Sequence, residues 1–370
     1  MSLEQWALLI ALTTSVLCAL CGCLLMVKKQ AMVSEGLSHA VLPGLVIAFL
    51  ILRDYSSPWL ILGAGLSGLV MIWLSSLIEK TRLVDPDAAL GLVFSAMFSF
   101  GIVIVSLNLR NTHFHADCII DGNLALAPLD RLKWGGRDWG PTSFYVVLLM
   151  LTLVSGFIAL CYKELKLMLF DESMAWQFEL RPKLLHLAWL CLVSFTIVVA
   201  FEVAGSILIV ALMIAPPTAA YLHADRLSHL LAGSVLVALV STLGGFYWAK
   251  SLDIAPTGPI ASCAGLVFLL MLCFAPKRGL LSYWWKRQQM RQTVLQSLVL
   301  THIANQTLGE LMELSRKSLE SSVIRPQQLN QLLAQLAQQG LAINQQDQWE
   351  LTAQGQQTLT QNQQRLGLEA

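Results

Sequence analysis

The sequence predicts an all-α polytopic membrane protein, a transmembrane bundle of about nine helices followed by a small cytoplasmic domain. Of the 370 residues, 56% are hydrophobic and 13% are charged, about half the charged fraction of soluble domains. Apolar runs of about 18 residues or more, each able to cross a hydrocarbon core of about 30 Å, recur down to about residue 275. After residue 282 the chain becomes polar and rich in glutamine. We therefore expect a transmembrane domain over residues 1–282 and a cytoplasmic domain over residues 283–370.

Nine apolar segments are the candidate spans. The first lacks the basic residues and the small-residue cleavage site of a signal peptide, so we expect it to be retained as a span. The second, seventh and ninth are short or interrupted by glycine and proline, and broken helices often line the substrate paths of transporters. The approximate limits are Trp6–Val27, Leu37–Leu52, Pro58–Ile78, Ala88–Leu107, Ser143–Cys161, Leu184–Glu202, Ser206–Leu222, Leu230–Ala249 and Pro259–Phe274.

Lysine and arginine predict the orientation, because short cytoplasmic loops carry an excess of them. With the N-terminus outside, the short outer loops hold only Arg53 and Lys250. The inner loops then hold Lys28, Lys29, Lys80, Arg82, Lys163, Lys166, Arg181, Lys183, Arg226, Lys277 and Arg278. Nine spans place the C-terminus inside.

The polar tail has the element order of a winged helix-turn-helix domain. Its amphipathic patterns predict helices at Arg291–Ala304, Thr307–Leu314 and Gln327–Gln339, then a hairpin of Leu341–Ile343 with Gln348–Leu351, and a last helix. From Tyr283 onward the chain has seven Lys and Arg against six Asp and Glu, whereas a DNA-binding face needs a basic footprint. A packing or regulatory module is therefore favoured over a metal-responsive DNA-binding regulator, and nucleic acid is not expected as a partner.

Glu35 and His39 lie four residues apart at the start of the second candidate span. On a helix this spacing places both side chains on one face. A carboxylate with an imidazole suits manganese, ferrous iron or zinc. Ionisable groups are costly in spanning segments and tend to mark pathways there. The alternative is a helix end near the inner surface, with Glu35 solvated and His39 in a structural hydrogen bond.

Five residues near the outer face are weaker candidates for contact with metal. These candidate entrance residues are His113, His115, Asp117, Glu202 and Asp253. The first three belong to the long outer loop Asn108–Thr142. For them, the favoured alternative is that they are solvated and have no ligand role. For Glu202, a kinked helix without a ligand role is an equally good explanation. For Asp253, a turn role is an equally good explanation.

Two further segments favour a transporter. The stretch Gly205–Ala220 contains Pro216 and Pro217, which would unwind a packed helix as a gating element requires. The inner segment Phe170–Trp176 would form an amphipathic cytoplasmic helix able to dock a motor subunit. A helix lying on lipid is the equal alternative for that segment.

These segments resemble the permease family of manganese, zinc and iron ABC importers. That family has a helix reading Asp-Ala-x-Ser-His-Ala-Val-Leu-Pro-Gly, and this chain has Glu35-Gly36-Leu37-Ser38-His39-Ala40-Val41-Leu42-Pro43-Gly44. The resemblance continues in Ala89–Ser95, Asp121–Leu124, Gly205–Pro216 and Leu252–Pro259, and covers residues 1 to about 281. Two departures are Glu35, where the family has aspartate, and Glu179, where its coupling helix has glycine.

The resemblance implies a function and a set of partners. The chain would be the permease subunit of an ATP-driven importer of divalent metal in a bacterial cytoplasmic membrane, with Glu35 and His39 as metal ligands. Its partners would be an ABC ATPase subunit, an external metal-binding protein and a second permease subunit, and no permanently bound cofactor is expected. The ATPase would be coupled through Phe170, Asp171, Glu172 and Ala175.

Rival functions follow from other features. The sequence has no phosphate-binding loop of the form Gly-x-x-x-x-Gly-Lys-Ser/Thr, so either a partner hydrolyses ATP or an ion gradient drives a secondary metal transporter. Gly65–Gly68 matches the Gly-x-Ser-Gly of rhomboid-type intramembrane proteases, with His186 as a conceivable partner, but such residues are common at helix seams. The cluster of Cys18, Cys21 and Cys23 has metal-ligand spacing, although packing of small apolar residues is the favoured explanation.

Overall fold

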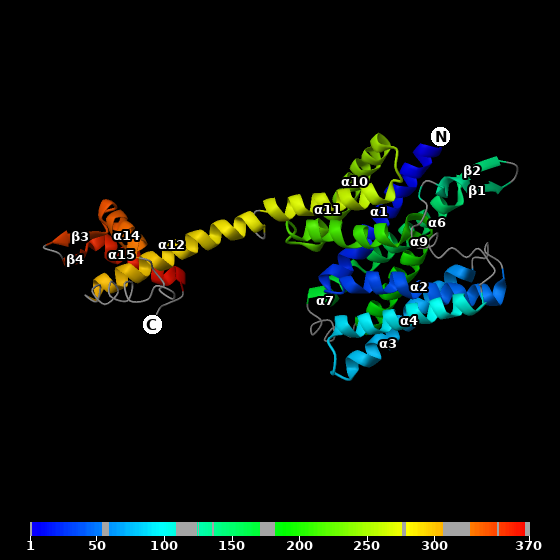
Figure 1. Ribbon diagram of the computed structural model, residues 1–370, viewed down its shortest axis with the longest axis horizontal. Helices are drawn as coiled ribbons and strands as arrows, with labels where there is room; N and C mark the ends of the chain where they lie inside the picture. Colours follow the sequence, from blue (N-terminus) through cyan, green and yellow to red (C-terminus); the bar gives the residue numbers. More distant parts are fainter. Residues whose placement is uncertain are drawn as a thin grey trace. The chain divides into compact units, whose positions relative to one another are not determined.

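The chain forms two compact units, Met1–Gly279 and Leu280–Ala370, in the computed structural model. Figure 1 traces the first from blue to yellow and the second from yellow to red. The structure describes residues 2–53, 59–108, 124, 126–134, 137–170, 182–275, 279–305, 326–345 and 348–366.

The first unit is a bundle of apolar helices. Eight of its described helices are long and apolar enough to cross a membrane. A shorter helix, α7 (Tyr162–Phe170), follows α6. The long helices are α1 (Leu3–Val27), α2 (Ala31–Leu52), α3 (Trp59–Lys80), α4 (Pro86–Asn108), α6 (Thr142–Leu160), α9 (Pro182–Tyr221), α10 (Leu227–Leu252) and α11 (Thr257–Phe274).

The expected sixth and seventh spans both lie within α9, in which two helices meet at a kink, so eight apolar elements stand where nine spans were expected. Gly205 alone within it leaves the helical conformation, with φ 74° and ψ 164°, a region that glycine enters at little cost. An unbroken helix over its 38 apolar residues would be about 57 Å long. The kink at Gly205 divides this length into two helices, between the expected span ends at Glu202 and Ser206.

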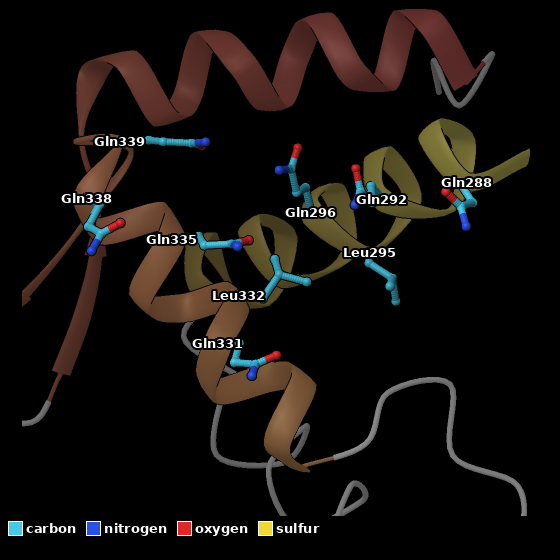
Figure 2. Close-up of a pocket in the computed structure, with 9 residues that line it drawn as sticks. All are labelled: Gln288, Gln292, Leu295, Gln296, Gln331, Leu332, Gln335, Gln338 and Gln339. Carbon is cyan, nitrogen blue, oxygen red and sulfur yellow. The ribbon is translucent and has the colours of Figure 1, made fainter. Parts of the chain in front are cut away.

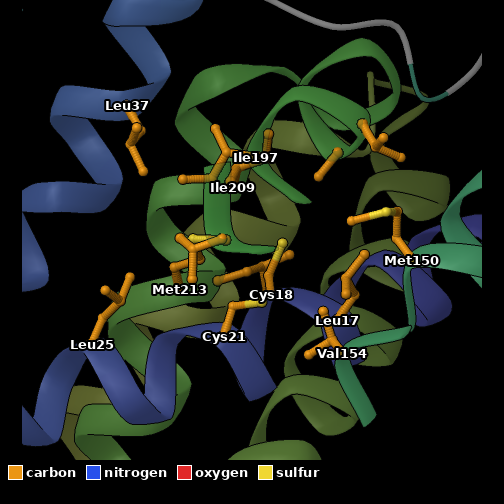
Figure 3. Packing of buried hydrophobic residues seen from close by; sticks show 14 of the residues in the cluster. Leu17, Cys18, Cys21, Leu25, Leu37, Met150, Val154, Ile197, Ile209 and Met213 are labelled. Carbon is orange, nitrogen blue, oxygen red and sulfur yellow. The ribbon is translucent and has the colours of Figure 1, made fainter. Parts of the chain in front are cut away.

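Helices α1 and α9 form the centre of the bundle. Of the most apolar stretch of each, 67% of α1 and 72% of α9 are buried, against 17–50% for the other six. Figure 3 shows Leu17, Cys18 and Cys21 of α1 beside Ile197, Ile209 and Met213 of α9. Close approach of this kind drives helix association in lipid, where the hydrophobic effect between helices is absent.

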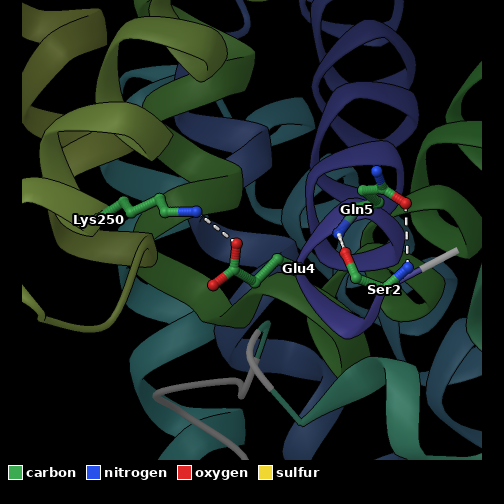
Figure 4. Close-up of polar contacts among 4 residues, drawn as sticks. All are labelled: Ser2, Glu4, Gln5 and Lys250. Carbon is green, nitrogen blue, oxygen red and sulfur yellow. Dashed lines mark hydrogen bonds and ion pairs between the residues drawn. The ribbon is translucent and has the colours of Figure 1, made fainter.

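Helices α1 and α10 run antiparallel. At one end Lys250 Nζ lies 2.5 Å from Glu4 Oε2, beside the Ser2–Gln5 capping box that begins α1 (Figure 4). At the other end the Cys23 thiol donates to Ser234 Oγ at 3.0 Å. The two contacts fix the register of the pair along its length.

A small hairpin precedes α6, in the part of the chain that the sequence analysis treated as loop. It consists of β1 (Arg131–Trp134) and β2 (Arg137–Pro141), after the 3-10 turn η1 (Ala127–Leu129). The ring of Trp6 in α1 lies 2.8 Å from where a Cβ on Gly140 would be, and Gly140 has a φ of +108°. This position in β2 therefore needs glycine for both space and conformation.

The second unit has a core of its own. Its elements are α12 (Leu280–Ala304), α14 (Pro326–Gln338), β3 (Ala342–Gln345), β4 (Gln348–Leu351) and α15 (Ala353–Leu366). Strands β3 and β4 pair antiparallel, and the core unites Leu295, Val299, Leu300, Ile303, Leu329, Leu333, Leu336, Ala342 and Leu359. The expected helix at Thr307–Leu314 lies outside the described residues, and the winged-helix assignment remains a prediction.

A polar groove of about 730 Å³ lies between α12 and α14. Figure 2 shows that glutamines from both helices line it. The lining residues are Gln288, Gln292, Leu295, Gln296, Gln331, Leu332, Gln335, Gln338 and Gln339. All are uncharged, so they offer no carboxylate or imidazole to a metal and no cation to a nucleic-acid phosphate.

Candidate functional site

Helix α2 carries Glu35 and His39 one turn apart, followed by Pro43 inside the same helix. Because proline has no N–H, Pro43 leaves the carbonyl of His39 without its helical donor. One residue on, the Ser67 hydroxyl of α3 donates to the Ala40 carbonyl. Gly44 lies against Gly63 and Ser67 of α3, so small residues bring the two helices together where α2 is interrupted.

The imidazole of His39 lies between two aromatic rings of α4. Its centroid is 5.5 Å from that of Phe94, stacked at 19°, and 5.2 Å from that of Phe98, edge-on at 70°. Rings held from two directions restrict the rotation of the imidazole. Neither phenylalanine was predicted to belong to the site, although their spacing of four along a helix was a visible signal.

Glu35 and His39 are both half-buried. Neither makes a recorded hydrogen bond or ion pair with another described residue, so the carboxylate oxygens and ring nitrogens retain their lone pairs for a cation. No group of three or more His, Cys, Asp or Glu able to hold a metal occurs among the described residues. The two side chains can therefore supply part of a metal coordination shell, which additional donors must complete.

Of the candidate entrance residues, the structure describes Glu202 and Asp253, and neither forms a metal-binding group with Glu35 and His39. Glu202 is exposed on α9, three residues before Gly205. Asp253 is exposed and ends α10 in a left-handed conformation, its N–H donating to the Ala249 carbonyl. This is the turn role that the sequence analysis weighed for it. His113, His115 and Asp117 lie outside the described residues.

Of the coupling segment, the structure describes only its first residue, Phe170. Helix α7 ends at Phe170, with Leu165 and Met168 buried. Asp171, Glu172 and Ala175 lie outside the described residues, so their coupling role remains a prediction.

The clustered cysteines of α1 point toward different helices. Cys21 Sγ lies 3.7 Å from Thr196 Oγ1 of α9, while Cys23 bonds to Ser234 of α10. Both thiols are buried. Their divergence favours packing over metal binding as their role.

The Gly65–Gly68 element is a helix seam. A Cβ on Gly65 would meet the ring of Phe195, and one on Gly68 would meet Ser194 Oγ, both from α9. Ser194 donates to the Gly65 carbonyl at 2.9 Å, and the Ser67 hydroxyl is engaged by Ala40. Packing accounts for this sequence, as expected for small residues between membrane helices.

A bundle of apolar helices, with a carboxylate–imidazole pair beside a proline in a membrane helix, defines a membrane transport protein of the permease class. Residues 1–275 match the ABC 3 transport family, and the chain belongs to this family.

Named relatives extend the comparison. The chain is 32% identical over 282 residues to the manganese transport system membrane protein MntD of Bacillus subtilis (strain 168), covering 76% of this chain and 95% of that protein. It is 37% identical over 272 residues to the zinc transport system membrane protein TroD of Treponema pallidum (strain Nichols), covering 73% and 74%. The structure of PsaBC from Streptococcus pneumoniae in complex with Fab shares the fold, with a TM-score of 0.63 and 23% identity over 75% of this chain and 94% of that one.

Proposed function

We propose that this chain is the membrane-spanning permease subunit of an ATP-driven importer of manganese, zinc or iron ions. The observation that carries the proposal is the pair of Glu35 and His39, held on one face of α2 with free donor atoms and an imidazole oriented by Phe94 and Phe98. Family membership supports the transport class, and the named relatives support a divalent metal as cargo.

The metal passes through a site that more than one subunit completes. Manganese, iron and zinc take at least four ligands, and among the described residues this helix face supplies two. A second permease subunit, presenting the same helix, would add two more and close the shell around a cation at a shared interface. Such a two-fold arrangement uses one surface twice, as in most symmetric dimers.

Other partners supply energy and cargo. A separate ABC ATPase subunit hydrolyses ATP and docks near the segment from Phe170 to Ala175, and an external metal-binding protein delivers the ion toward Glu202 and the outer loops. The complex lies in a bacterial cytoplasmic membrane. The chain itself is a transporter subunit and not an enzyme.

The test is reconstitution of the permease with and without its ATPase, followed by metal-specific elemental analysis of the vesicle contents. We expect uptake that requires ATP, the ATPase and the external binding protein. Uptake by the chain alone, driven by an ion gradient, would establish the secondary transporter instead. Parallel runs with manganese, zinc and iron identify the cargo.

A further inference from the structure

The first turns of α12 expose a ring of aromatic side chains that metal transport does not use. Tyr283, Trp284 and Trp285 are 65%, 58% and 66% exposed. The leucines before them, Leu280 and Leu281, are 56% and 48% exposed. Contiguous apolar surface of this kind in a folded protein marks a site of interaction.

The core of the second unit does not need these residues. Helix α12 contributes to that core only from Leu295 onward, through Leu295, Val299, Leu300 and Ile303. Between Leu280 and Met290 no described side chain is buried. The first half of the helix therefore takes no part in the core of its own domain.

The arrangement of the three aromatic residues indicates what covers them. Consecutive helix positions differ by about 100° and 1.5 Å, so the three rings spread over about 200° around the helix axis within a layer about 3 Å thick. A flat docking surface would cover one side and leave a tryptophan in water. A helix that passes through the headgroup layer of a bilayer is covered on all sides at one depth. Tyrosine and tryptophan are enriched at that depth, because each has an apolar body and a polar tip.

Charge and chain continuity point to the same partner. Basic pairs bracket the apolar stretch in the sequence, Lys277-Arg278 before it and Lys286-Arg287 after it, and anionic lipid headgroups attract such residues. The apolar helix α11 ends at Phe274. Five residues separate Phe274 from Leu280, so α12 follows the last apolar helix along the chain after a short connection.

We propose that residues 280–287 form an interfacial anchor, in which Tyr283, Trp284 and Trp285 occupy the lipid headgroup layer and Lys286 and Arg287 bind anionic headgroups. The anchor holds the start of the second unit at the bilayer surface. It rests on the membrane assignment of the chain and is independent of the metal ligands.

Spin-label depth measurements on the full chain test the anchor. The eight native cysteines are replaced, and a nitroxide is attached through Trp284→Cys in vesicles of phosphatidylcholine with phosphatidylglycerol. The matched control is Gln292→Cys, an exposed position about 12 Å further along the same helix. Tyr283→Cys provides a second position in the ring. Collision rates with oxygen, which concentrates in lipid, and with a water-soluble nickel chelate report the depth of each label.

We expect the label at position 284 to be several-fold more accessible to oxygen, and several-fold less accessible to nickel, than the label at position 292. Equal nickel accessibility at the two positions would place the ring in water and overturn the proposal. Shielding of position 284 from both reagents would also overturn it, because a protein surface would then cover the ring.

A charge variant tests the basic pair separately. Lys286→Gln with Arg287→Gln should raise nickel accessibility at position 284 in vesicles containing phosphatidylglycerol. With the basic pair unchanged, vesicles of pure phosphatidylcholine should give the same rise in nickel accessibility at position 284. If neither change alters the depth, the assignment of Lys286 and Arg287 to anionic headgroups is wrong.

Discussion

Gly22 of α1 lies directly against the backbone carbonyl oxygen of Met213 in α9. Pro217, four residues after Met213, has no N–H, so this carbonyl has lost its helical donor. In lipid no water satisfies it. The approach of α1 places the Gly22 backbone where Cα–H···O contact with the freed oxygen is available. The proline-containing half of α9, expected from the sequence to act as a gating element, is thus packed against α1 at its interrupted turn.

Substituting Gly22 by alanine should therefore destabilise the bundle. The added methyl group would overlap the Met213 carbonyl, and overpacking of this kind costs about 1–3 kcal/mol. Thermal unfolding of the detergent-solubilised chain would show a lowered Tm, and reconstituted uptake would fall if the gate must pack against α1.

The matched control is Gly156→Ala in α6, where an added Cβ meets nothing within 4 Å. Alanine in an open helical position favours the helix by about 1 kcal/mol over glycine, so this variant should unfold at an equal or higher temperature. If both variants lower the Tm equally, the Gly22–Met213 contact is not the cause.

The metal pair gives the second prediction. His39→Ala removes a proposed metal ligand and should abolish uptake while protein abundance stays near that of the parent. Glu35→Gln keeps the shape but removes the charge, so uptake should fall severely, whereas Glu35→Asp should retain part of it because a carboxylate remains. Metal-specific elemental analysis of cells expressing each variant measures the effect.

Variants around the pair separate ligation from packing. Phe94→Leu keeps an apolar neighbour but removes the stacked ring, and we expect a partial loss of uptake, about tenfold or less, as for residues that orient a ligand. Ile51→Ala, an exposed position near the far end of α2, should leave uptake unchanged. Full uptake by His39→Ala would show that the imidazole is not part of the metal path.

Buried hydroxyls give the third prediction, because some have partners and others have none. Thr14 of α1 is 1% exposed, and its hydroxyl has no partner among the described residues, whereas Ser194 donates to the Gly65 carbonyl at 2.9 Å. Thr14→Val should leave stability unchanged or raise it, since it removes an unsatisfied polar group. Ser194→Ala should cost about 1 kcal/mol. Thermal unfolding compares the two, and a larger loss for Thr14→Val would indicate a water bound at that site.

Hydropathy made the membrane spans predictable, but not how they connect. The pattern of apolar residues in α1, α3 and α4 is long and uninterrupted, so their ends required little inference, whereas α2 begins at Ala31 and not at the expected Leu37. The region from Glu202 to Ser206 resembles a turn in sequence, and the structure has a kink between two helices at Gly205 within it. Local sequence indicates this break but not how the two helices are oriented about it, because packing of α9 against α1 and its other neighbours decides that.

The candidate site was predictable in part for a related reason. Glu35 and His39 share one helix, and their spacing alone places them on one face. The contacts of His39 with Phe94 and Phe98 connect α2 with α4, and a pattern within one helix carries no information about such pairs. The start of α12 at Leu280 and not Arg291 was missed because aromatic residues in its first turns have only moderate helix propensity.

The second unit gives the last prediction. Its core is formed within residues 280–370, and the eight apolar helices and α7 all precede it. A separately folded module should be dispensable for insertion of the helices before it. We therefore expect a chain ending near Tyr283 to insert, to bind its ATPase and to transport metal, while losing a response to internal metal if the tail provides one. Membrane fractionation, co-purification and uptake measure these properties in turn.

Two outcomes would contradict this account of the tail. A truncated chain that fails to insert would show that the transmembrane unit depends on residues beyond the boundary. Sequence-selective, metal-dependent binding of DNA by the full chain at physiological salt, absent from the truncated chain, would establish the DNA-binding regulator instead. The neutral groove between α12 and α14 and the nearly balanced charge of the tail argue for the opposite result, because DNA affinity depends on cations placed against phosphates. An anisotropy titration against the gene's own upstream region, run for both chains at two salt concentrations, decides between a regulator of transcription and a module that acts on the permease.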